Sequence, residues 1–162
     1  MTMEIALTQG QVALIDDDDF ELVSRYKWCA AWDPSTKSFR AITTIRKDDG
    51  KRTALLMHRL IMNANKGEEV DHIHHFTLDN RKSELRLCTR SQNMQNTHKY
   101  ANNRSGHKGV YWINNCQKWR AQIRSNGQPI HLGIFTDIND AIAARAAATL
   151  LYHGEFGRIS CP

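Results

Sequence analysis

The dipeptide Asn126-Gly127 constrains the fold of this chain more than any other feature. A two-residue turn between antiparallel strands needs positive φ at both central residues, and Asn-Gly adopts that conformation most readily. The flanking segments, 119–125 and 130–135, are rich in strand-forming residues. Apolar and polar residues alternate along the first of them. We therefore expect an apolar face that puts Trp119 in the core and a polar face that carries Arg120, Gln122 and Arg124.

A third strand and one helix are expected to complete this unit. The strand is predicted over 108–113. The helix is predicted to begin after Thr136-Asp137, because either side chain can cap its first turn, and to end at Gly154. Its alanine-rich middle permits close packing on the apolar face of the sheet. The segment 107–162 thus predicts a three-stranded antiparallel sheet packed on one helix.

The net charge of +5 lies entirely in the second half of the chain. Residues 1–90 contain 14 Lys or Arg and 14 Asp or Glu, whereas residues 91–162 contain 8 and 3. Between Ser91 and Thr136 there are six basic residues and no acidic one. A solvated face normally mixes both signs, whereas a one-signed block is typical of a surface that binds a polyanion. The charge pattern favours a nucleic acid partner.

Residues 1–66 are expected to form a small β-rich region. The segments 4–7 and 11–15 are separated by a short Gly-containing connection typical of a hairpin. Further strands are predicted over 39–45 and 54–57, on either side of a polar turn that contains Asp49-Gly50. Both tryptophans of this region, Trp28 and Trp32, are expected in its core.

Two features of this region leave alternatives open. Asp16 to Asp19 could form a metal site or begin a helix that continues through Val23, and the helix start is favoured because carboxylates stabilise a helix N-terminus and one of them can cap it. His58-Arg59 lies on a short helix expected over 58–62 and could face DNA. For His58, packing in the interior is the commoner outcome.

The segment 70–100 has the order strand, loop, strand, helix. An apolar pair flanks Asp71-His72 at a predicted strand end, 74–84 is rich in turn residues, 85–88 suits a second strand, and 89–100 suits a polar helix. If the segment folds back on itself, the first strand end can face Asn93 in the first turns of the helix. Three polar side chains would then meet at one point.

These side chains suit the hydrolysis of a phosphodiester, which needs a deprotonated water and a counter-charge for the negative transition state. His72 can act as general base near neutral pH, because the ordinary pKa of histidine is about 6.5. Asp71 and Asn93 offer hard oxygen ligands of the kind that Mg²⁺ prefers. The segment therefore predicts a metal-dependent nuclease site.

Over about residues 68–96 the chain resembles the HNH, or ββα-metal, endonucleases of the phage type, through Asp71-His72, Leu78-Asp79-Asn80-Arg81, Leu85-Arg86-Leu87 and Gln92-Asn93. The resemblance implies that His72 is the general base, that Asp71 and Asn93 bind one Mg²⁺ or Mn²⁺, and that Asn80 and Glu84 position the loop. Two places depart from the family pattern. Glu84 replaces the family's middle Asn, and His74-His75 replaces an Asn-Gly pair.

Residues 105–160 resemble the plant Apetala or ethylene-response-factor type of DNA-binding domain, through Lys108-Gly109-Val110, Lys118-Trp119, Gln122-Ile123-Arg124, His131-Leu132-Gly133-Ile134-Phe135 and His153-Gly154-Glu155-Phe156. The resemblance implies that the sheet enters the major groove. The DNA contacts implied are those of Lys108, Gly109, Tyr111, Arg120, Gln122, Arg124 and His131. The basic side chain of Lys118 is expected to contact phosphates as well. The plant domains carry arginines at several positions that are Tyr111, Pro129 and His131 in this chain.

Together these features predict an α+β protein with an HNH nuclease domain over 1–99, a linker over 100–106 and a DNA-binding domain over 107–162. The expected function is site-specific, divalent-metal-dependent cleavage of double-stranded DNA, of the phage-borne or free-standing homing kind, by a monomer or homodimer. A sequence-specific DNA-binding protein with an inactive nuclease core is the alternative, and RNA binding is a third possibility. The isolated cysteines are expected to be reduced thiols, and the lack of a leader or an apolar span predicts a cytoplasmic protein.

Overall fold

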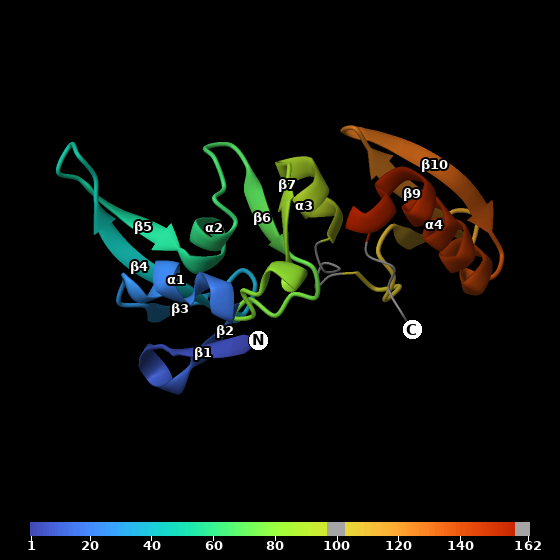
Figure 1. The fold of residues 1–162 in the computed structure, drawn as a ribbon. Coiled ribbons are helices and arrows are strands. Elements are labelled where there is room, and N and C mark those ends of the chain that lie inside the picture. Colours follow the sequence, from blue (N-terminus) through green and yellow to red (C-terminus); the bar gives the residue numbers. More distant parts are fainter. Residues whose placement is uncertain (97–102, 158–162) are drawn as a thin grey trace. The chain divides into compact units, whose positions relative to one another are not determined.

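The computed structural model describes residues 1–96 and 103–157, and the chain divides into two compact units, Met1–Thr89 and Arg90–Pro162. Short antiparallel sheets and a few helices make up both units (Figure 1), so the protein is α+β as predicted. The predicted nuclease domain extended to residue 99, whereas α3 (Arg90–Asn96) groups with the second unit. Residues 97–100 of the helix predicted over 89–100, and residues 100–102 of the linker predicted over 100–106, lie outside the described residues.

The first unit begins with the predicted hairpin, formed by β1 (Thr2–Ala6) and β2 (Val12–Asp16). A second sheet has the strand order β3-β4-β5, with bounds Cys29–Asp33, Ser38–Arg46 and Arg52–Leu56. The short helices α1 (Phe20–Ser24) and α2 (Met57–Ile61) add Val23 and Met57 to its core, both fully buried. The region is β-rich, as the sequence predicted.

The two tryptophans of this unit differ in burial. Trp28 is 6% exposed and donates its indole N–H to the carbonyl of Val23 at 2.9 Å, so its predicted place in the core is confirmed. Trp32 is 53% exposed, and its predicted place in the core is wrong. It pairs with Phe39 near the turn end of the β3–β4 hairpin, where the two rings pack edge to face at 5.0 Å. A cross-strand aromatic contact thus takes the place of burial.

The run of carboxylates does begin a helix, because a 3-10 turn over Asp17–Asp19 leads directly into α1. The predicted cap is wrong, since neither helix start has a side-chain hydrogen bond from its N-cap residue. The carboxylates have other partners. Asp17 accepts from the N-terminal ammonium at 2.8 Å, and Asp16 and Asp19 accept from Lys82.

The next elements follow the predicted order of strand, loop, strand and helix. β6 (Glu69–His72) pairs antiparallel with β7 (Leu85–Cys88), and a 3-10 turn over Lys82–Glu84 ends the connecting loop. The polar helix α3 follows. Val70 and Leu85 join the core of the first unit, which fixes the register of the pair and leaves Asp71 and His72 opposite Arg86 and Leu85.

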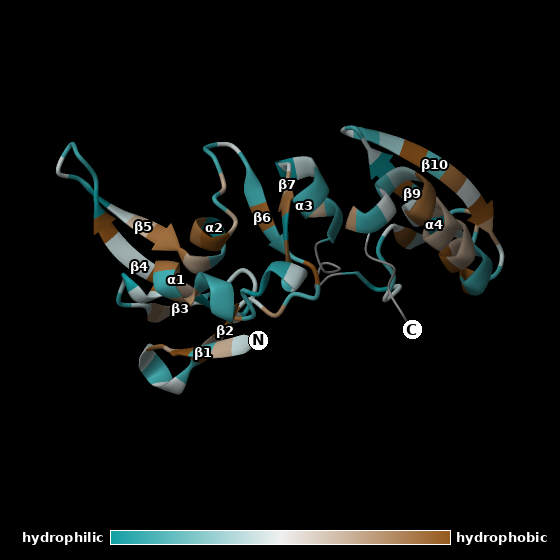
Figure 2. Ribbon diagram, viewed as in Figure 1, coloured by the Kyte–Doolittle hydropathy of each residue, from teal (hydrophilic) through white to brown (hydrophobic). Residues whose placement is uncertain are grey.

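The second unit contains β8 (Val110–Ile113), β9 (Lys118–Ser125), β10 (Gln128–Phe135) and α4 (Ile138–His153), which ends in a 3-10 turn over Gly154–Phe156. Asn126 and Gly127 have φ of 50° and 78°, as the predicted turn requires. Apolar residues lie on β10 and α4 (Figure 2), and Ala121 and Ala141 are fully buried between sheet and helix. The predicted three-stranded sheet packed on one helix is confirmed.

Local signals explain both ends of α4. Asp137 caps it, as one of the two predicted candidates, by accepting from the backbone N–H of Asn139 at 2.7 Å. Gly154 follows its last residue with φ of 52°. Within the described residues, no helix combines the length and apolar character that crossing a bilayer requires. Three cysteines, Cys29, Cys88 and Cys116, are free thiols, and Cys161 lies outside the described residues.

Candidate functional site

The pairing of β6 with β7 brings Asp71 and Arg86 face to face. They are register partners, and Oδ2 of Asp71 accepts from Nε of Arg86 at 2.9 Å and from Nη2 at 2.6 Å. Asp71 is 6% exposed. The guanidinium fork therefore holds the carboxylate in one orientation. Arg86 has no role in the sequence-based prediction, although its place opposite Asp71 follows from the register of two strands.

His72, the last residue of β6, packs its ring against the ring of His58 from α2. The ring centroids lie 5.1 Å apart and the planes meet at 79°, which is an edge-to-face arrangement. Both residues are buried, with exposures of 8% and 7%. His58 is therefore packed in the interior, as the sequence favoured, but its neighbour there is the predicted general base.

Burial keeps both imidazoles neutral. Desolvation lowers the pKa of His72 below its ordinary value, although a hydrogen bond with Asn80 and the charge of Asp71 act in the opposite direction. Desolvation lowers the pKa of His58 to about 3, and the repulsion that a protonated His72 would exert acts in the same direction. Arg40 on β4 lowers both values. No local sequence signal relates Arg40 to this site, because it comes from a strand of another sheet.

The pKa of His58 predicts that acid destabilises the first unit. The folded protein keeps this imidazole neutral while the unfolded chain binds a proton below about pH 6.5, so the contribution to stability is complete above that pH and is lost as the pH falls toward 3. Between pH 7 and pH 4 we expect a loss on the order of 3 kcal/mol from this residue. Urea unfolding at a series of pH values, followed by tryptophan fluorescence, measures it.

A His58→Phe variant should lose this component, so its stability should depend less steeply on pH. His131→Gln is the control, because His131 is exposed on the second unit. Equal pH slopes in the wild type and in His58→Phe would contradict the assignment of acid sensitivity to this imidazole.

The side chain of Arg59 stabilises the loop that leads into β6. Its guanidinium donates to the carbonyls of Glu68 at 2.6 Å, Asn65 at 2.9 Å and Ala64 at 3.2 Å. These bonds commit the side chain to its own loop, in contrast to the interpretation in which it faces DNA. The geometry of the loop then sets where Asp71 and His72 lie.

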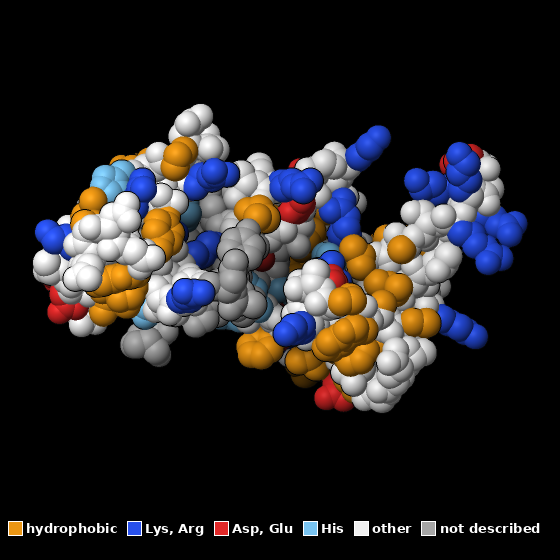
Figure 3. Space-filling model, turned by 180° about the vertical axis from the view of Figure 1, so that it is seen from behind, with side chains coloured by type: hydrophobic (Ala, Val, Ile, Leu, Met, Phe, Trp, Pro, Cys, Tyr) orange, Lys and Arg blue, Asp and Glu red, His pale blue; other side chains and the backbone are white. Residues whose placement is uncertain are grey.

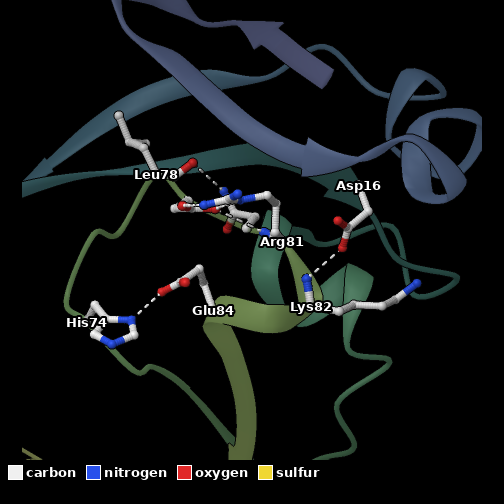
Figure 4. Close-up of polar contacts among 8 residues, drawn as sticks. Asp16, His74, Leu78, Arg81, Lys82 and Glu84 are labelled. Carbon is white, nitrogen blue, oxygen red and sulfur yellow. Dashed lines mark hydrogen bonds and ion pairs between the residues drawn. The ribbon is translucent and has the colours of Figure 1, made fainter. Parts of the chain in front are cut away.

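The loop between β6 and β7 is held from the N-terminal hairpin. The backbone N–H of Leu14 donates to the carbonyl of Leu78 at 2.9 Å, and the N–H of Asn80 donates back to the carbonyl of Leu14 at 2.7 Å. Lys82 is fixed in the same way, because its backbone N–H donates to Asp16 at 2.8 Å (Figure 4) and its ammonium to Asp19 at 2.7 Å. One role of the β-rich region is therefore to order this loop.

Asn80 lies at the centre of this arrangement and is 1% exposed. Besides its backbone bond, its side-chain amide donates to the carbonyl of Leu78 at 3.1 Å. Thr77 adds a second anchor by donating its hydroxyl to the carbonyl of Phe39 at 2.6 Å. The loop next to His72 is thus tied to two separate strands of the first unit.

The two departures from the HNH pattern are bonded to each other. Nδ1 of His74 lies 2.6 Å from Oε2 of Glu84 (Figure 4). His74 is largely exposed, whereas the side chain of Glu84 is 19% exposed. The carbonyl of Glu84 also accepts from the N–H of Ile73 at 2.9 Å, next to the predicted base. A carboxylate and an imidazole thus close the loop at the position where the family has an amide.

The donor set of the predicted metal site is a carboxylate and an amide. Asp71 supplies a carboxylate held by Arg86, and Asn93 lies half-buried on α3 in the second unit. Both are hard oxygen donors that suit Mg²⁺ or Mn²⁺, which complete their shells with water and substrate phosphate. Within residues 1–96 and 103–157, no three His, Cys, Asp or Glu side chains are grouped to share an ion.

The sheet of the second unit presents the predicted polar row. Arg120 and Gln122 are partly buried and Arg124 is exposed, on the face opposite the buried Ala121 and Ile123. Tyr111 is the register partner of Arg120, and His131 that of Gln122, so strands β8, β9 and β10 contribute to one surface. Lys118 is exposed at the start of β9. On the face of the molecule drawn in Figure 3, blue Lys and Arg side chains occur on both units, and red carboxylates are fewer.

Lys108 and Gly109 have structural partners. The ammonium of Lys108 donates to the carbonyls of Met94 and Gln95, both at 3.1 Å, near the C-terminal end of α3. Gly109 has φ of +78°, and a Cβ there would lie 2.4 Å from the carbonyl oxygen of Gln122. The fold itself therefore requires a glycine at this position, apart from any contact with DNA.

Comparison of the chain with protein-family models, with curated proteins and with solved structures finds no match.

Proposed function

We propose that the protein is a divalent-metal-dependent DNA endonuclease of the HNH type. The observation that carries the proposal is the pair Asp71-His72, buried at the end of β6 beside Arg86 and a braced loop. Neutral histidine is the form that can accept a proton, and burial favours that form of His72. The order of β6, loop, β7 and α3 agrees with the family resemblance.

Each residue of the site has a defined task in this proposal. His72 accepts the proton of the attacking water at one ring nitrogen, and the edge-to-face contact with His58 holds its ring in place. Arg86 orients the carboxylate of Asp71. Asp71 and Asn93 would hold Mg²⁺ or Mn²⁺, which supplies counter-charge for the phosphorane and for the leaving oxygen.

The second unit would bind double-stranded DNA through its sheet. The contacting set is that expected from the sequence: Lys108, Gly109, Tyr111, Lys118, Arg120, Gln122, Arg124 and His131. Support comes from the polar row that three strands contribute to one surface and from the basic excess in this half of the chain. Side chains that reach phosphates contribute affinity, whereas those that reach base edges contribute sequence preference.

Lys118→Ala and Arg124→Ala should weaken DNA binding and flatten its dependence on salt. Each lost phosphate contact should lower the slope of log K against log [salt] by roughly 0.9. Titrating a labelled duplex at several salt concentrations measures the slope. Arg25→Ala is a matched control, because Arg25 is an exposed arginine of the first unit that pairs with Glu21. Slopes equal to the wild type in both sheet variants would remove these residues from the phosphate contacts.

A cleavage assay on duplex DNA tests the proposed activity directly. Purified full-length protein should nick or cut DNA with Mg²⁺ or Mn²⁺, and EDTA should stop the reaction. Mapping the new ends on each strand separates a nick from a double-strand break and identifies the target. If DNA stays intact with every divalent ion, the endonuclease assignment is wrong.

The contact between His74 and Glu84 favours a second candidate, a DNA-binding protein with an inactive nuclease core. Glu84 takes the place of the amide that the family uses to fix the loop, and its carboxylate is occupied by His74. In that case the wild type binds DNA without cutting it, and Glu84→Asn restores cleavage. The same assay on wild type and Glu84→Asn separates the two functions.

A further inference from the structure

The second unit contains a pocket of about 900 Å³ with an unusual charge distribution. It lies among α3, the segment before β8, β9 and the inner side of α4, and it extends beyond the sheet surface described above. Among the described residues that line it there is no Asp or Glu. Its basic residues are Arg90, Arg104, Lys108, Arg124 and Arg145, with His153 beside them.

Arg145 is the residue that points most strongly to a ligand. It is 8% exposed on the inner side of α4, and its Nη1 donates to the hydroxyl of Thr149. Its Nε has no hydrogen-bond partner, and within the described part of the chain it forms no salt bridge. An arginine cannot lose its charge by deprotonation, and burying an uncompensated charge is costly. A bound anion would offset that cost.

Among the described residues that line the pocket with Arg145, none adds a negative charge. His153 donates through Nε2 to the carbonyl of Arg124 at 2.8 Å, and its buried Nδ1 has no partner among the described residues. Trp112, which is 45% exposed, packs edge to face on Trp119 at 5.0 Å and gives the pocket an aromatic side. Guanidinium forks recognise phosphate oxygens, and an exposed indole can stack on a base.

We propose that this pocket binds a phosphate group of a nucleotide, with Arg90, Arg104 and Arg145 supplying the positive charge and Trp112 a surface for the base. The phosphate can belong to the DNA strand that the sheet holds or to a free nucleotide. The proposal rests on the proposed function only in the first of these cases. The pocket would extend the contact with DNA from the sheet to α3 and α4 within the second unit.

The first measurement concerns phosphate alone. Millimolar inorganic phosphate, compared with chloride at equal ionic strength, should raise the melting temperature of full-length wild type. The increase should be lost in the double variant Arg90→Gln/Arg104→Gln and in Arg145→Met, and largely kept in Arg145→Lys. Arg52→Gln, at an exposed arginine of the first unit, is the control and should respond like wild type. The double variant changes side chains at the pocket rim, so it answers the question even if Arg145→Met fails to fold.

The second measurement is the salt dependence of duplex DNA binding. If the DNA strand occupies the pocket, the double variant should lower the slope by roughly one unit, because one phosphate contact, worth about 0.9, is lost. If the double variant loses the increase in melting temperature with phosphate but keeps the wild-type salt slope for DNA binding, the pocket binds free nucleotides and not the DNA strand. If the wild-type protein does not bind duplex DNA, the proposed function is refuted. The effect of phosphate on the melting temperature still tests whether the pocket binds phosphate. If neither the phosphate response nor the DNA slope differs between wild type and the double variant, the pocket proposal is overturned.

Discussion

Replacing His72 with alanine should reduce DNA cleavage by about 10²- to 10⁴-fold, the usual contribution of a general base, and leave DNA binding intact. The variant removes the imidazole that is proposed to accept the proton of the attacking water, whereas Asp71 and Arg86 remain paired with each other. The sheet of the second unit is unchanged. Single-turnover cleavage with Mg²⁺, together with a binding titration of the same duplex, separates the two effects.

His72→Gln is the control for packing, because it keeps a polar side chain of similar reach next to His58. It should fold and bind DNA as wild type does, yet cleave as poorly as His72→Ala. The pH profile gives a further check. Because burial lowers the pKa of His72, the cleavage rate should be level near neutral pH and fall only below about pH 6.5. Cleavage by His72→Ala at the rate of wild type would exclude this residue as the base.

Gly109→Ala should destabilise the second unit by about 2–4 kcal/mol. This is the sum of the free-energy cost of a left-handed backbone conformation for alanine and the cost of an overpacked contact. Gly109 has φ of +78°, and the added Cβ would lie 2.4 Å from the carbonyl oxygen of Gln122 and 2.6 Å from Nε of Arg145. A backbone oxygen in a strand cannot move aside without disturbing the pairing of β8 and β9. Urea unfolding with fluorescence detection gives the difference in unfolding free energy.

Gly127 provides a matched control, because it has the same φ of +78° but nothing within 4 Å of the position of a Cβ. Gly127→Ala should therefore lose only the conformational part, about 1–2 kcal/mol. The difference between the two variants isolates the steric contact. Equal losses in both would show that Gly109 is not needed for space, and would leave the predicted DNA contact as its remaining role.

Features set by neighbouring residues could be predicted from the sequence. Asn126 and Gly127 determine their own turn, Asp137 caps the helix that follows it, and the alternation along 119–125 fixes which side chains face α4. The predictions that were wrong concern residues whose binding partners lie far away in the sequence. Asp16 and Asp19 have the composition of a helix cap, but the residue that binds them, Lys82, is 66 and 63 positions away.

One part of the candidate site could likewise be predicted from the sequence, and another part could not. A sequence pattern identifies Asp71 and His72 as neighbours on one strand, and the register of β6 and β7 adds Arg86. The contact of His58 with His72 and the effect of Arg40 on both imidazoles depend on how α2 and β4 pack, which no periodicity encodes. The burial of Arg145 is equally hidden, because an arginine in an alanine-rich helix has the composition of an exposed position.

The bonds between Leu14 and the loop of Leu78 and Asn80 have a consequence for how the protein folds. They join the start of the first unit to its far end, so the entropy of closing a long loop opposes their formation. During synthesis, β1 and β2 leave the ribosome well before the loop that they bind. His72 can reach its final surroundings only after Lys82 has left the exit tunnel. We therefore expect the hairpin to protect its amides from hydrogen exchange late in refolding, together with the loop and not before it.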